Sequence, residues 1–295
     1  MLKHPQHLAP SRPFLKWLGG KGRLLPTLLP LLPPGSRLIE PFVGAGAVFL
    51  GSSYPAAILG DANPDLAAVW VAIKEQRREF VARASELFCD GNRSPEAYLR
   101  IRTEFNESVD RFERAVRFMY LNKFGFNGLY RVNKRGVFNV PYGHPDALPR
   151  FPFDEVALAA EKLKAATVLS GGFAATMELA TVGDVVYCDP PYSDLETQTS
   201  FTGYAAQGFG VAEHKELVAA AREAAAKGAT VLISNHDTPQ TRALYEGFEI
   251  VELTVRRSVA ADAGKRLAAR ELLAKLRPSS IFPFPANPPP GVRFG

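Results

Sequence analysis

The chain has 295 residues, of which 46% are hydrophobic and 22% are charged, so it has the composition of a globular protein that buries a proper core. A net charge of +5 does not by itself indicate a nucleic-acid partner, because many proteins without one carry such a charge. Cys89 and Cys188 lack the paired spacing of metal or redox sites, so we expect no metal. Prolines interrupt the leucine-rich stretch 24–32 and no signal peptide is recognisable, so we expect a cytoplasmic protein without a membrane span.

A glycine-rich turn lies between the first expected strand, residues 38–40, and a helix-like segment, residues 47–50. Gly44 and Gly46 occupy this turn, and open α/β sheets bind nucleotides where a strand leads into a helix. The turn lacks the third glycine of a dinucleotide fingerprint and the lysine and hydroxyl residue of a phosphate loop. It therefore fits a cofactor without phosphates, and S-adenosylmethionine is such a cofactor.

Two further residues extend this cofactor hypothesis. Asp61 closes the next strand-like run, residues 57–60, where its carboxylate is placed to accept hydrogen bonds from ribose hydroxyls. The alternative is that Asp61 only caps the following helix. Trp17 lies in a loop rich in glycine and lysine, and in that setting we favour packing against a cofactor over a place in the core.

The section from residue 75 to residue 150 differs from the alternating pattern around it. Amphipathic helices are followed by a glycine- and asparagine-rich segment, residues 125–143, which predicts a β-hairpin with its turn at residues 133–136. Residues 114–145 contain no Asp or Glu, and their cations are Arg114, Arg117, Lys123, Arg131, Lys134 and Arg135. Cations that alternate with aromatics and glycines suit a hairpin that follows a nucleic-acid backbone; the alternative is a solvated basic face.

The alternation of strands and helices resumes after this section. Strand-like segments occur at residues 167–170, 184–188 and 229–234, and a helical run occurs at residues 211–227. Cys188 continues an apolar strand, so we interpret it as a core residue and not as a nucleophile. The whole pattern predicts an α/β fold with a Rossmann-like, doubly wound sheet.

These patterns predict a division of the chain into three parts. Residues 1–74 and 151–277 form the expected catalytic domain, which depends on S-adenosylmethionine. Residues 75–150 form an inserted target-recognition domain of helices and a β-hairpin. Residues 278–295 form a tail whose proline density excludes a helix, and we expect this tail to be mobile.

Asp189, Pro190, Pro191 and Tyr192 follow the strand that ends at Cys188. An exocyclic amine is a poor nucleophile because its lone pair is delocalised into the ring of the base. The Asp189 carboxylate and the Pro190 carbonyl can each accept one amine hydrogen, which aims the lone pair at an incoming methyl group. Tyr192 can stack on the face of the base. A proline turn after a buried strand is the alternative, but the glycine-rich turn favours amino-group methylation of a base.

Seven blocks of sequence occur in the order found in one known family. They are residues 14–21 (FLKWLGGK), 40–46 (EPFVGAG), 61–63 (DAN), 122–129 (NKFGFNGL), 138–141 (FNVP), 189–192 (DPPY) and 232–237 (LISNHD). With these blocks, from about Pro13 to Pro278, the chain resembles the DNA adenine-N6 methyltransferases of the Dam type. So many blocks in the family's order make the resemblance highly specific.

The resemblance implies roles for individual residues around the cofactor. The residues implied to bind it are Trp17, Lys21, Asp61 and Asp189, together with Phe42, Gly44, Gly46 and Phe173. Within this set, Phe42 and Phe173 are implied to sandwich the adenine of the cofactor.

The resemblance also implies contacts with DNA. The residues concerned are Lys16, Phe126, Asn127, Leu129, Arg131, Lys134 and Pro141. Phe126 and Asn127 are implied to fill the space left by a flipped adenine, where stacking replaces the lost base stack. Arg131 has the planar fork that suits guanine O6 and N7, and Lys134 suits a phosphate. Phe126 stands where the family more often has tyrosine, and Tyr130 stands where smaller residues occur.

The order of the motifs is that of the subgroup that contains Dam, and it implies GATC as the target sequence. We expect an enzyme that transfers a methyl group from S-adenosylmethionine to the N6 amine of a flipped adenine in double-stranded DNA, acting as a monomer. One alternative is an RNA base amino-methyltransferase, against which the duplex-reading hairpin argues. The other is a catalytically inactive DNA-binding regulator, against which the intact Asp61 and Asp189 argue.

Overall fold

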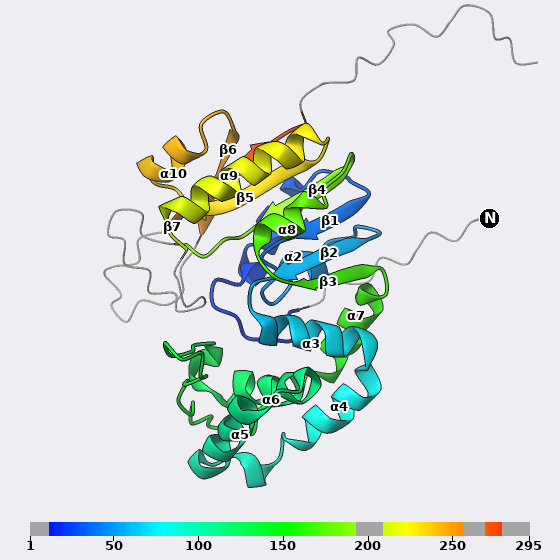
Figure 1. The fold of residues 1–295 in the computed structure, drawn as a ribbon, viewed down its shortest axis with the longest axis vertical. Helices are drawn as coiled ribbons and strands as arrows, with labels where there is room; N and C mark the ends of the chain where they lie inside the picture. Colours follow the sequence, from blue (N-terminus) through cyan, green and yellow to red (C-terminus); the bar gives the residue numbers. More distant parts are fainter. Residues whose placement is uncertain (1–11, 193–208, 256–268, 279–295) are drawn as a thin grey trace, which may run out of the picture.

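A seven-stranded sheet forms the centre of the computed structural model, which describes residues 12–192, 209–255 and 269–278 (Figure 1). The strands are β1 (Arg37–Glu40), β2 (Ala57–Asp61), β3 (Ala166–Ser170), β4 (Asp184–Cys188), β5 (Thr230–His236), β6 (Glu249–Val255) and β7 (Ala269–Leu276). Their spatial order is β3-β2-β1-β4-β5-β7-β6, and only the β7 pairings with β5 and β6 are antiparallel. The order reverses between β1 and β4, which is where open α/β sheets form their binding crevice. The prediction of a doubly wound α/β sheet is confirmed.

Helices cover both faces of this sheet. On one side lie α1 (Leu25–Leu28), α2 (Ala47–Gly51), α3 (Pro64–Glu75) and α7 (Phe153–Leu163). On the other side lie α8 (Phe173–Glu178), α9 (Val211–Ala226) and α10 (Pro239–Leu244). Short 3-10 turns occur at Lys21–Arg23, Leu29–Leu31, Asp90–Asn92 and Phe126–Gly128.

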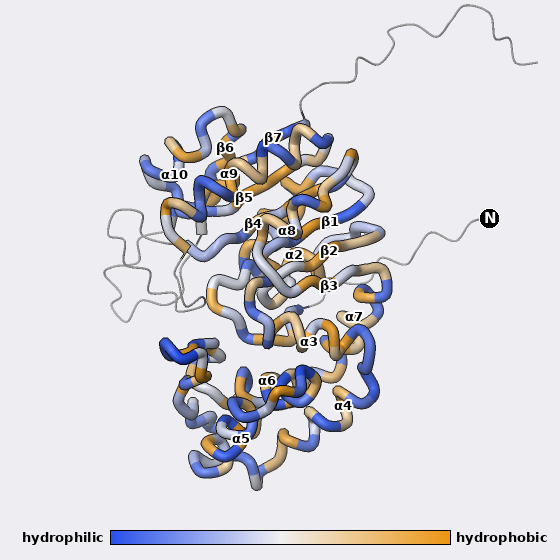
Figure 2. Tube along the Cα trace, in the orientation of Figure 1, coloured by the Kyte–Doolittle hydropathy of each residue, from blue (hydrophilic) through white to orange (hydrophobic). Residues whose placement is uncertain are grey.

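Alternate side chains of the central strands enter two separate hydrophobic cores. Ile39 of β1 and Val186 of β4 pack with Leu217 of α9, whereas Leu38 and Tyr187 belong to the core on the α3 side. This alternation follows from the period of two in a β-strand. The colours in Figure 2 show the hydrophobic residues concentrated along the central strands. Because both faces are covered, the strands read as nearly continuous apolar runs, which made them predictable from the sequence.

A second group of helices lies beyond α3, on the far side from the sheet (Figure 1). It consists of α4 (Arg77–Glu86), α5 (Pro95–Glu107) and α6 (Arg111–Phe124). Ser94 and Asp110 begin α5 and α6 by accepting hydrogen bonds from backbone amides of the first turn. Helix α3 is apolar on nearly every side because it packs against the sheet and also against α6.

The predicted hairpin at residues 125–143 forms only in part. The chain turns back at Asn133, but its two arms make isolated bridges, Gly125 with Tyr142 and Val132 with Phe138, and no paired strands. The arms share antiparallel backbone bonds from Asn133 N to Val137 O and from Asn139 N to Arg131 O, and side chains of α5 bind backbone groups that point away from this pairing. Asn106 bonds both the N–H and the C=O of Phe138, while Tyr98 and Arg102 donate to the carbonyl of Val140. The predicted hairpin therefore forms with its turn at residues 133–136, but its arms make only isolated antiparallel bridges and not continuous strands.

Candidate active site

A cavity of about 770 Å³ opens at the carboxyl ends of β1, β2, β4 and β5; we call it the strand-end cavity. Its volume falls in the range of about 300–1,000 Å³ that is usual for small-molecule and cofactor sites. The sequence-predicted residues that line it are Trp17, Lys21, Phe42, Gly44, Asp61, Phe173, Asp189, Pro190 and Tyr192. The fold thus brings together the residues predicted for cofactor binding and for catalysis, with Gly46 outside the lining.

Glycine is favoured at the two positions of the turn for different structural reasons. Gly44 has φ +50°, and a Cβ atom there would lie 2.9 Å from Cδ1 of Trp17, which packs over the turn. Gly46 has φ +67° and precedes α2, and a Cβ there would lie 2.7 Å from the ring of Trp70. A left-handed backbone and a close neighbour both favour glycine at these positions. Gly46 therefore shapes the turn, while Gly44 forms part of the cavity wall.

Both carboxylate oxygens of Asp61 accept hydrogen bonds from backbone amides. Oδ2 accepts from Gly44 N at 3.0 Å, and Oδ1 accepts from Asn63 N at 2.9 Å. Burial raises the pKa of Asp61 to about 6, against the lowering effect of these two bonds. The N-cap of α3 is Asn63, whose side chain accepts from the amides of Asp65 and Leu66. The alternative interpretation of Asp61 as the helix cap was therefore wrong.

Asp189 is held by a cation and a hydroxyl. Lys21 Nζ lies 2.7 Å from Asp189 Oδ1, and Ser234 Oγ donates to the same oxygen at 2.9 Å. The Tyr187 hydroxyl lies 3.1 Å from Ser234 Oγ, so a chain of polar groups leads from the core to the carboxylate. No individual role was predicted for Ser234, although it lies in one of the seven blocks. The signal that could have identified Ser234 is its position near the carboxyl end of an expected strand, β5, which pairs with β4.

Tyr192 lies among polar groups from three other segments. Its hydroxyl donates to Glu271 Oε2 at 3.2 Å, and its ring centroid lies 4.5 Å from Lys21 Nζ. The His236 ring meets it edge-on, with centroids 4.5 Å apart. Burial, and then the nearby Asp189 charge, raise the pKa of Tyr192 well above its usual value. The tyrosine is therefore a neutral ring that is held at the mouth of the Asp189 site.

The aromatic end of the cavity contains one more ring than the sequence predicted. Phe42 and Phe173 stack with centroids 5.4 Å apart, and Phe209 meets Phe42 edge-on at 5.6 Å. A flat base between two rings needs about 7 Å, because each stacking contact takes about 3.5 Å. In this structure the two predicted rings contact each other, with no room for a base between them. Phe209 was missed because it stands apart from the recognised blocks.

Glu40 at the end of β1 is another residue to which sequence reasoning assigned no role. Its side chain lines the cavity, is only 3% exposed, and has no hydrogen-bond partner for Oε2 among the described residues. Burial raises the pKa of Glu40 to about 8, so the carboxyl group is mainly protonated at neutral pH. A buried polar atom without a partner in a cavity wall is a group that a ligand can satisfy.

The residues predicted to contact DNA lie outside the strand-end cavity. Those that are exposed are Lys16, Phe126, Asn127, Arg131, Lys134 and Pro141, and Leu129 is half-buried. Phe126 is 48% exposed although it is a large apolar ring, and it donates its backbone N–H to Pro141 O at 3.0 Å. The guanidinium of Arg131 is oriented by two bonds to Asn139, from Nε to Oδ1 and from Nη2 to the carbonyl.

Asn122 of α6 connects the DNA set to the cavity wall. Its buried amide accepts from the backbone N–H of Lys16 at 2.9 Å and donates to the Lys16 carbonyl at 2.7 Å. The same amide nitrogen lies 3.3 Å from the carbonyl of Gly128. Lys16 thus lies beside the 125–143 loop and directly precedes Trp17 of the cavity. Sequence reasoning quoted Asn122 in a block but assigned it no role.

The described segments contain neither a metal-binding cluster nor a membrane-spanning helix. Within residues 12–192, 209–255 and 269–278, no group of three or more His, Cys, Asp or Glu side chains is arranged to hold a metal ion. No helix in the same part of the chain is long and apolar enough to cross a membrane.

The sheet order, with the cavity at the strand ends and the Asp189 segment in its wall, defines a Rossmann-like α/β methyltransferase. Residues 17–259 match the family model of the D12 class N6 adenine-specific DNA methyltransferases, and the chain belongs to this family. The resemblance drawn from the sequence, and the assignment as an adenine-specific DNA methyltransferase, are confirmed.

Several curated relatives are similar over nearly the whole chain. A DNA adenine methylase of Escherichia coli (strain K12) is 42% identical over 273 residues, which cover 92% of this chain and 98% of the relative. A DNA adenine methylase of Vibrio cholerae is 41% identical over 269 residues, or 91% of this chain and 97% of the relative. One from Haemophilus influenzae is 42% identical over 266 residues, or 89% and 93% of the two chains.

Proposed function

We propose that this enzyme transfers a methyl group from S-adenosylmethionine to the N6 amine of an adenine that is flipped out of a GATC site in duplex DNA. The observation that carries the proposal is the position of Asp189 in the same cavity wall as Asp61 and Glu40. Asp189, the proposed acceptor for the target amine, then faces the same cavity as Asp61 and Glu40, the proposed acceptors for the cofactor.

The cavity wall has groups that match each part of S-adenosylmethionine. Asp61 offers carboxylate oxygens to ribose hydroxyls, and the Phe42, Phe173 and Phe209 rings offer apolar surface to an adenine. Lys21 offers a cation to the carboxylate of the amino-acid end. Glu40 Oε2, which has no partner among the described residues, offers an oxygen to its ammonium group. When bound, this cofactor would supply an electrophilic methyl group on a sulfonium and leave as a neutral thioether.

The residues of the chain position the target amine. Both described polar contacts of Asp189 fall on Oδ1, which leaves Oδ2 to accept one amine hydrogen. The Pro190 carbonyl accepts the second hydrogen, and the Tyr192 ring stacks on the base. Held in this way, the lone pair of the nitrogen would face the methyl group that the bound cofactor supplies, and the amine proton would pass to water once the methyl group is transferred. Effective positioning of this kind supplies several kcal/mol of the barrier reduction.

The depth of the site supports base flipping as part of this proposal. The Asp189 side chain is only 20% exposed, so an amine that is still paired inside a duplex cannot reach it. Residues 75–150 act in this proposal as the target-recognition domain. Exposed Phe126 fills the vacated space in the duplex, while Leu129, Arg131 and Pro141 read base edges and Lys16 and Lys134 contact phosphates.

Incorporation of labelled methyl groups from S-adenosylmethionine tests this proposal directly. A duplex with one GATC site should be labelled, and nucleoside analysis should find the label on N6 of adenine. Duplexes with one changed base pair should react more slowly, by about 1–3 kcal/mol per change. Equal labelling of all duplexes would contradict the GATC target. Preferential labelling of an RNA of the same sequence would favour an RNA base methyltransferase, and no labelling at all would favour an inactive DNA-binding regulator.

A further inference from the structure

Tyr130 lies between two of the proposed base-reading residues, Leu129 and Arg131, but its own side chain points away from solvent. It is 8% exposed and packs against Phe118 of α6 and Phe138 of the 125–143 loop, with ring centroids 5.7 and 5.6 Å away. Its hydroxyl donates to Asp65 Oδ2 at 2.8 Å. This bond joins the base-reading segment to the first turn of α3.

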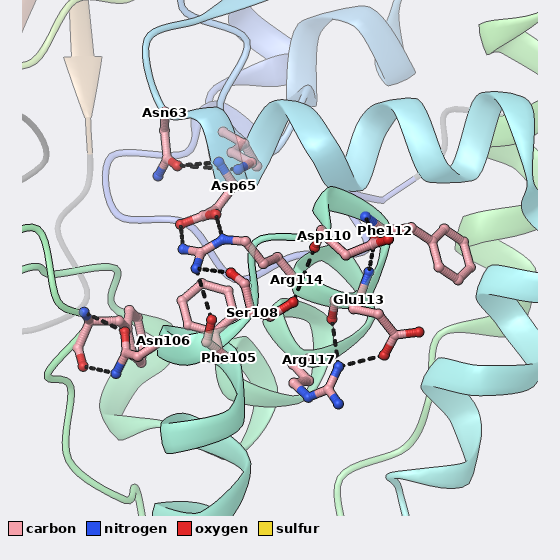
Figure 3. Close-up of polar contacts among 12 residues, drawn as sticks. Asn63, Asp65, Phe105, Asn106, Ser108, Asp110, Phe112, Glu113, Arg114 and Arg117 are labelled. Carbon is pink, nitrogen blue, oxygen red and sulfur yellow. Dashed lines mark hydrogen bonds and ion pairs between the residues drawn. The ribbon is translucent and has the colours of Figure 1, made fainter.

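Asp65 is a rigid anchor because Arg114 fixes it (Figure 3). Arg114 Nε donates to Asp65 Oδ1 at 2.6 Å, and Nη2 donates to Oδ2 at 2.9 Å. The same guanidinium donates from Nη1 to the carbonyls of Phe105 and Ser108, and it lies over the Phe105 ring. A bidentate pair whose other donors are also used has little freedom to move.

The anchor lies directly behind the wall of the strand-end cavity, two residues after Asn63, which lines it. Asp65 follows Asn63, whose backbone N–H donates to Asp61, the proposed ribose acceptor. The Tyr130 ring lies 6.4 Å from Trp17, which packs over the turn at Gly44. Burial and the Asp65 charge raise the pKa of Tyr130 above its usual value, so the hydroxyl keeps the proton that it donates. From within the 125–143 loop, Tyr130 therefore contacts Trp17 of the cavity wall and Asp65, which lies directly behind that wall.

We propose that Tyr130 is a positioning residue for sequence specificity, and that its hydroxyl bond to Asp65 holds Leu129 and Arg131 in register with the strand-end cavity. This inference rests on the proposed function, since it assigns base reading to the same loop. Tyr130 touches no base. It acts through Arg131, whose guanidinium must meet its base while the target adenine lies at Asp189.

The test compares methylation rates on a GATC duplex and on duplexes with one changed base pair at the guanine. Tyr130→Phe keeps the ring and its packing but removes the bond to Asp65. We expect it to reduce the discrimination ratio by about fivefold, and to leave cofactor affinity without DNA within about twofold of the wild type. Tyr120→Phe is the matched control. It removes the hydroxyl of another buried tyrosine, which donates to Asn92 O in the same helix group but away from Asp65.

A double variant distinguishes positioning from a general loss of stability. If Tyr130 acts through Arg131, then Tyr130→Phe combined with Arg131→Ala should discriminate no less well than Arg131→Ala alone. The inference is overturned if Tyr130→Phe slows all duplexes by one factor, or if Tyr120→Phe lowers discrimination equally. A wild-type enzyme that does not discriminate would instead overturn the GATC proposal, and the inference with it.

Discussion

The ammonium of Lys21 and the carboxylate of Asp189 form an ion pair of 2.7 Å in the wall of the strand-end cavity, with side chains 7% and 20% exposed. Lys21 begins a short 3-10 turn near the N-terminus, and Asp189 follows β4. The pair therefore joins the group proposed to hold the cofactor carboxylate to the group proposed to accept the amine hydrogen. In this arrangement a cofactor carboxylate and Asp189 compete for one cation.

Lys21→Met should weaken cofactor binding by about tenfold or more, because a charge-assisted bond contributes ~1.5–3 kcal/mol. Calorimetric titration with S-adenosylmethionine measures the change. Lys164→Met is the control, since Lys164 is an exposed lysine that pairs with Glu161 on α7, away from the cavity. Equal affinity of Lys21→Met and Lys164→Met would remove Lys21 from the proposed site.

Cofactor binding should become weaker as the pH falls through about 6, because protonation of Asp61 removes the acceptor for ribose hydroxyls. We expect about tenfold weaker binding at pH 5 than at pH 7. Asp61→Asn should bind weakly at both pH values and lose this dependence. Cofactor titrations of the wild type and of Asp61→Asn between pH 5 and pH 7 measure this dependence. The same pH dependence in the variant would show that another group is responsible.

The free energy of unfolding should fall as the pH rises, because of the buried carboxyl group of Glu40. The pKa of this buried carboxyl is raised from an ordinary value of 4.5 to about 8 in the folded protein. Its contribution to stability is therefore fully present below pH 4.5 and is lost as the pH rises through about 8, by ~1.4 kcal/mol per pH unit. Glu40→Gln mimics the neutral form, so its free energy of unfolding should lack this fall. Urea unfolding at several pH values compares the two proteins, and identical pH profiles would contradict the assignment.

Arg131→Ala should relax sequence discrimination more than it lowers general DNA affinity. A guanidinium that pairs bidentately with one guanine contributes about 1–3 kcal/mol of discrimination. Lys134→Ala is the companion variant, because an exposed lysine at the turn of the loop is proposed to meet phosphate. It should weaken binding to all duplexes alike and reduce the salt dependence. If Arg131→Ala slows every duplex by the same factor, Arg131 must be reassigned to the backbone.

The strands of the sheet were predictable because helices cover both faces and leave continuous apolar runs, as at residues 184–188. The positions of Asp61 and Asp189 at the edge of the sheet were predictable for the same reason, since each aspartate comes at the end of one of these apolar runs. The antiparallel strands β6 and β7 were not predicted. Arg270, Glu271 and Lys275 place charges near both ends of β7, which therefore lacks the continuous apolar run of a covered strand.

Contacts between segments that are distant in the chain could not be predicted from the sequence. Nothing in the spacing of Asp65 and Arg114 indicates a bidentate ion pair, and the basic segment around Arg114 suggested an exposed cation instead. Ser234 reaches Asp189 only because β5 pairs with β4. The sequence does not explain why a tyrosine stands at position 130, because its partner Asp65 is 65 residues away in the chain. Such contacts arise from tertiary packing, which local propensity does not encode.

The central claim is that Asp189 positions the amine that receives the methyl group. Single-turnover methylation of a GATC duplex by Asp189→Ala, at saturating cofactor and with duplex binding measured alongside, tests it most directly. We predict that the rate falls by far more than tenfold while duplex affinity largely survives, because the change removes an acceptor for the amine and no phosphate contact. A variant that keeps more than about a tenth of the wild-type rate, a loss below ~1.4 kcal/mol, would contradict the account.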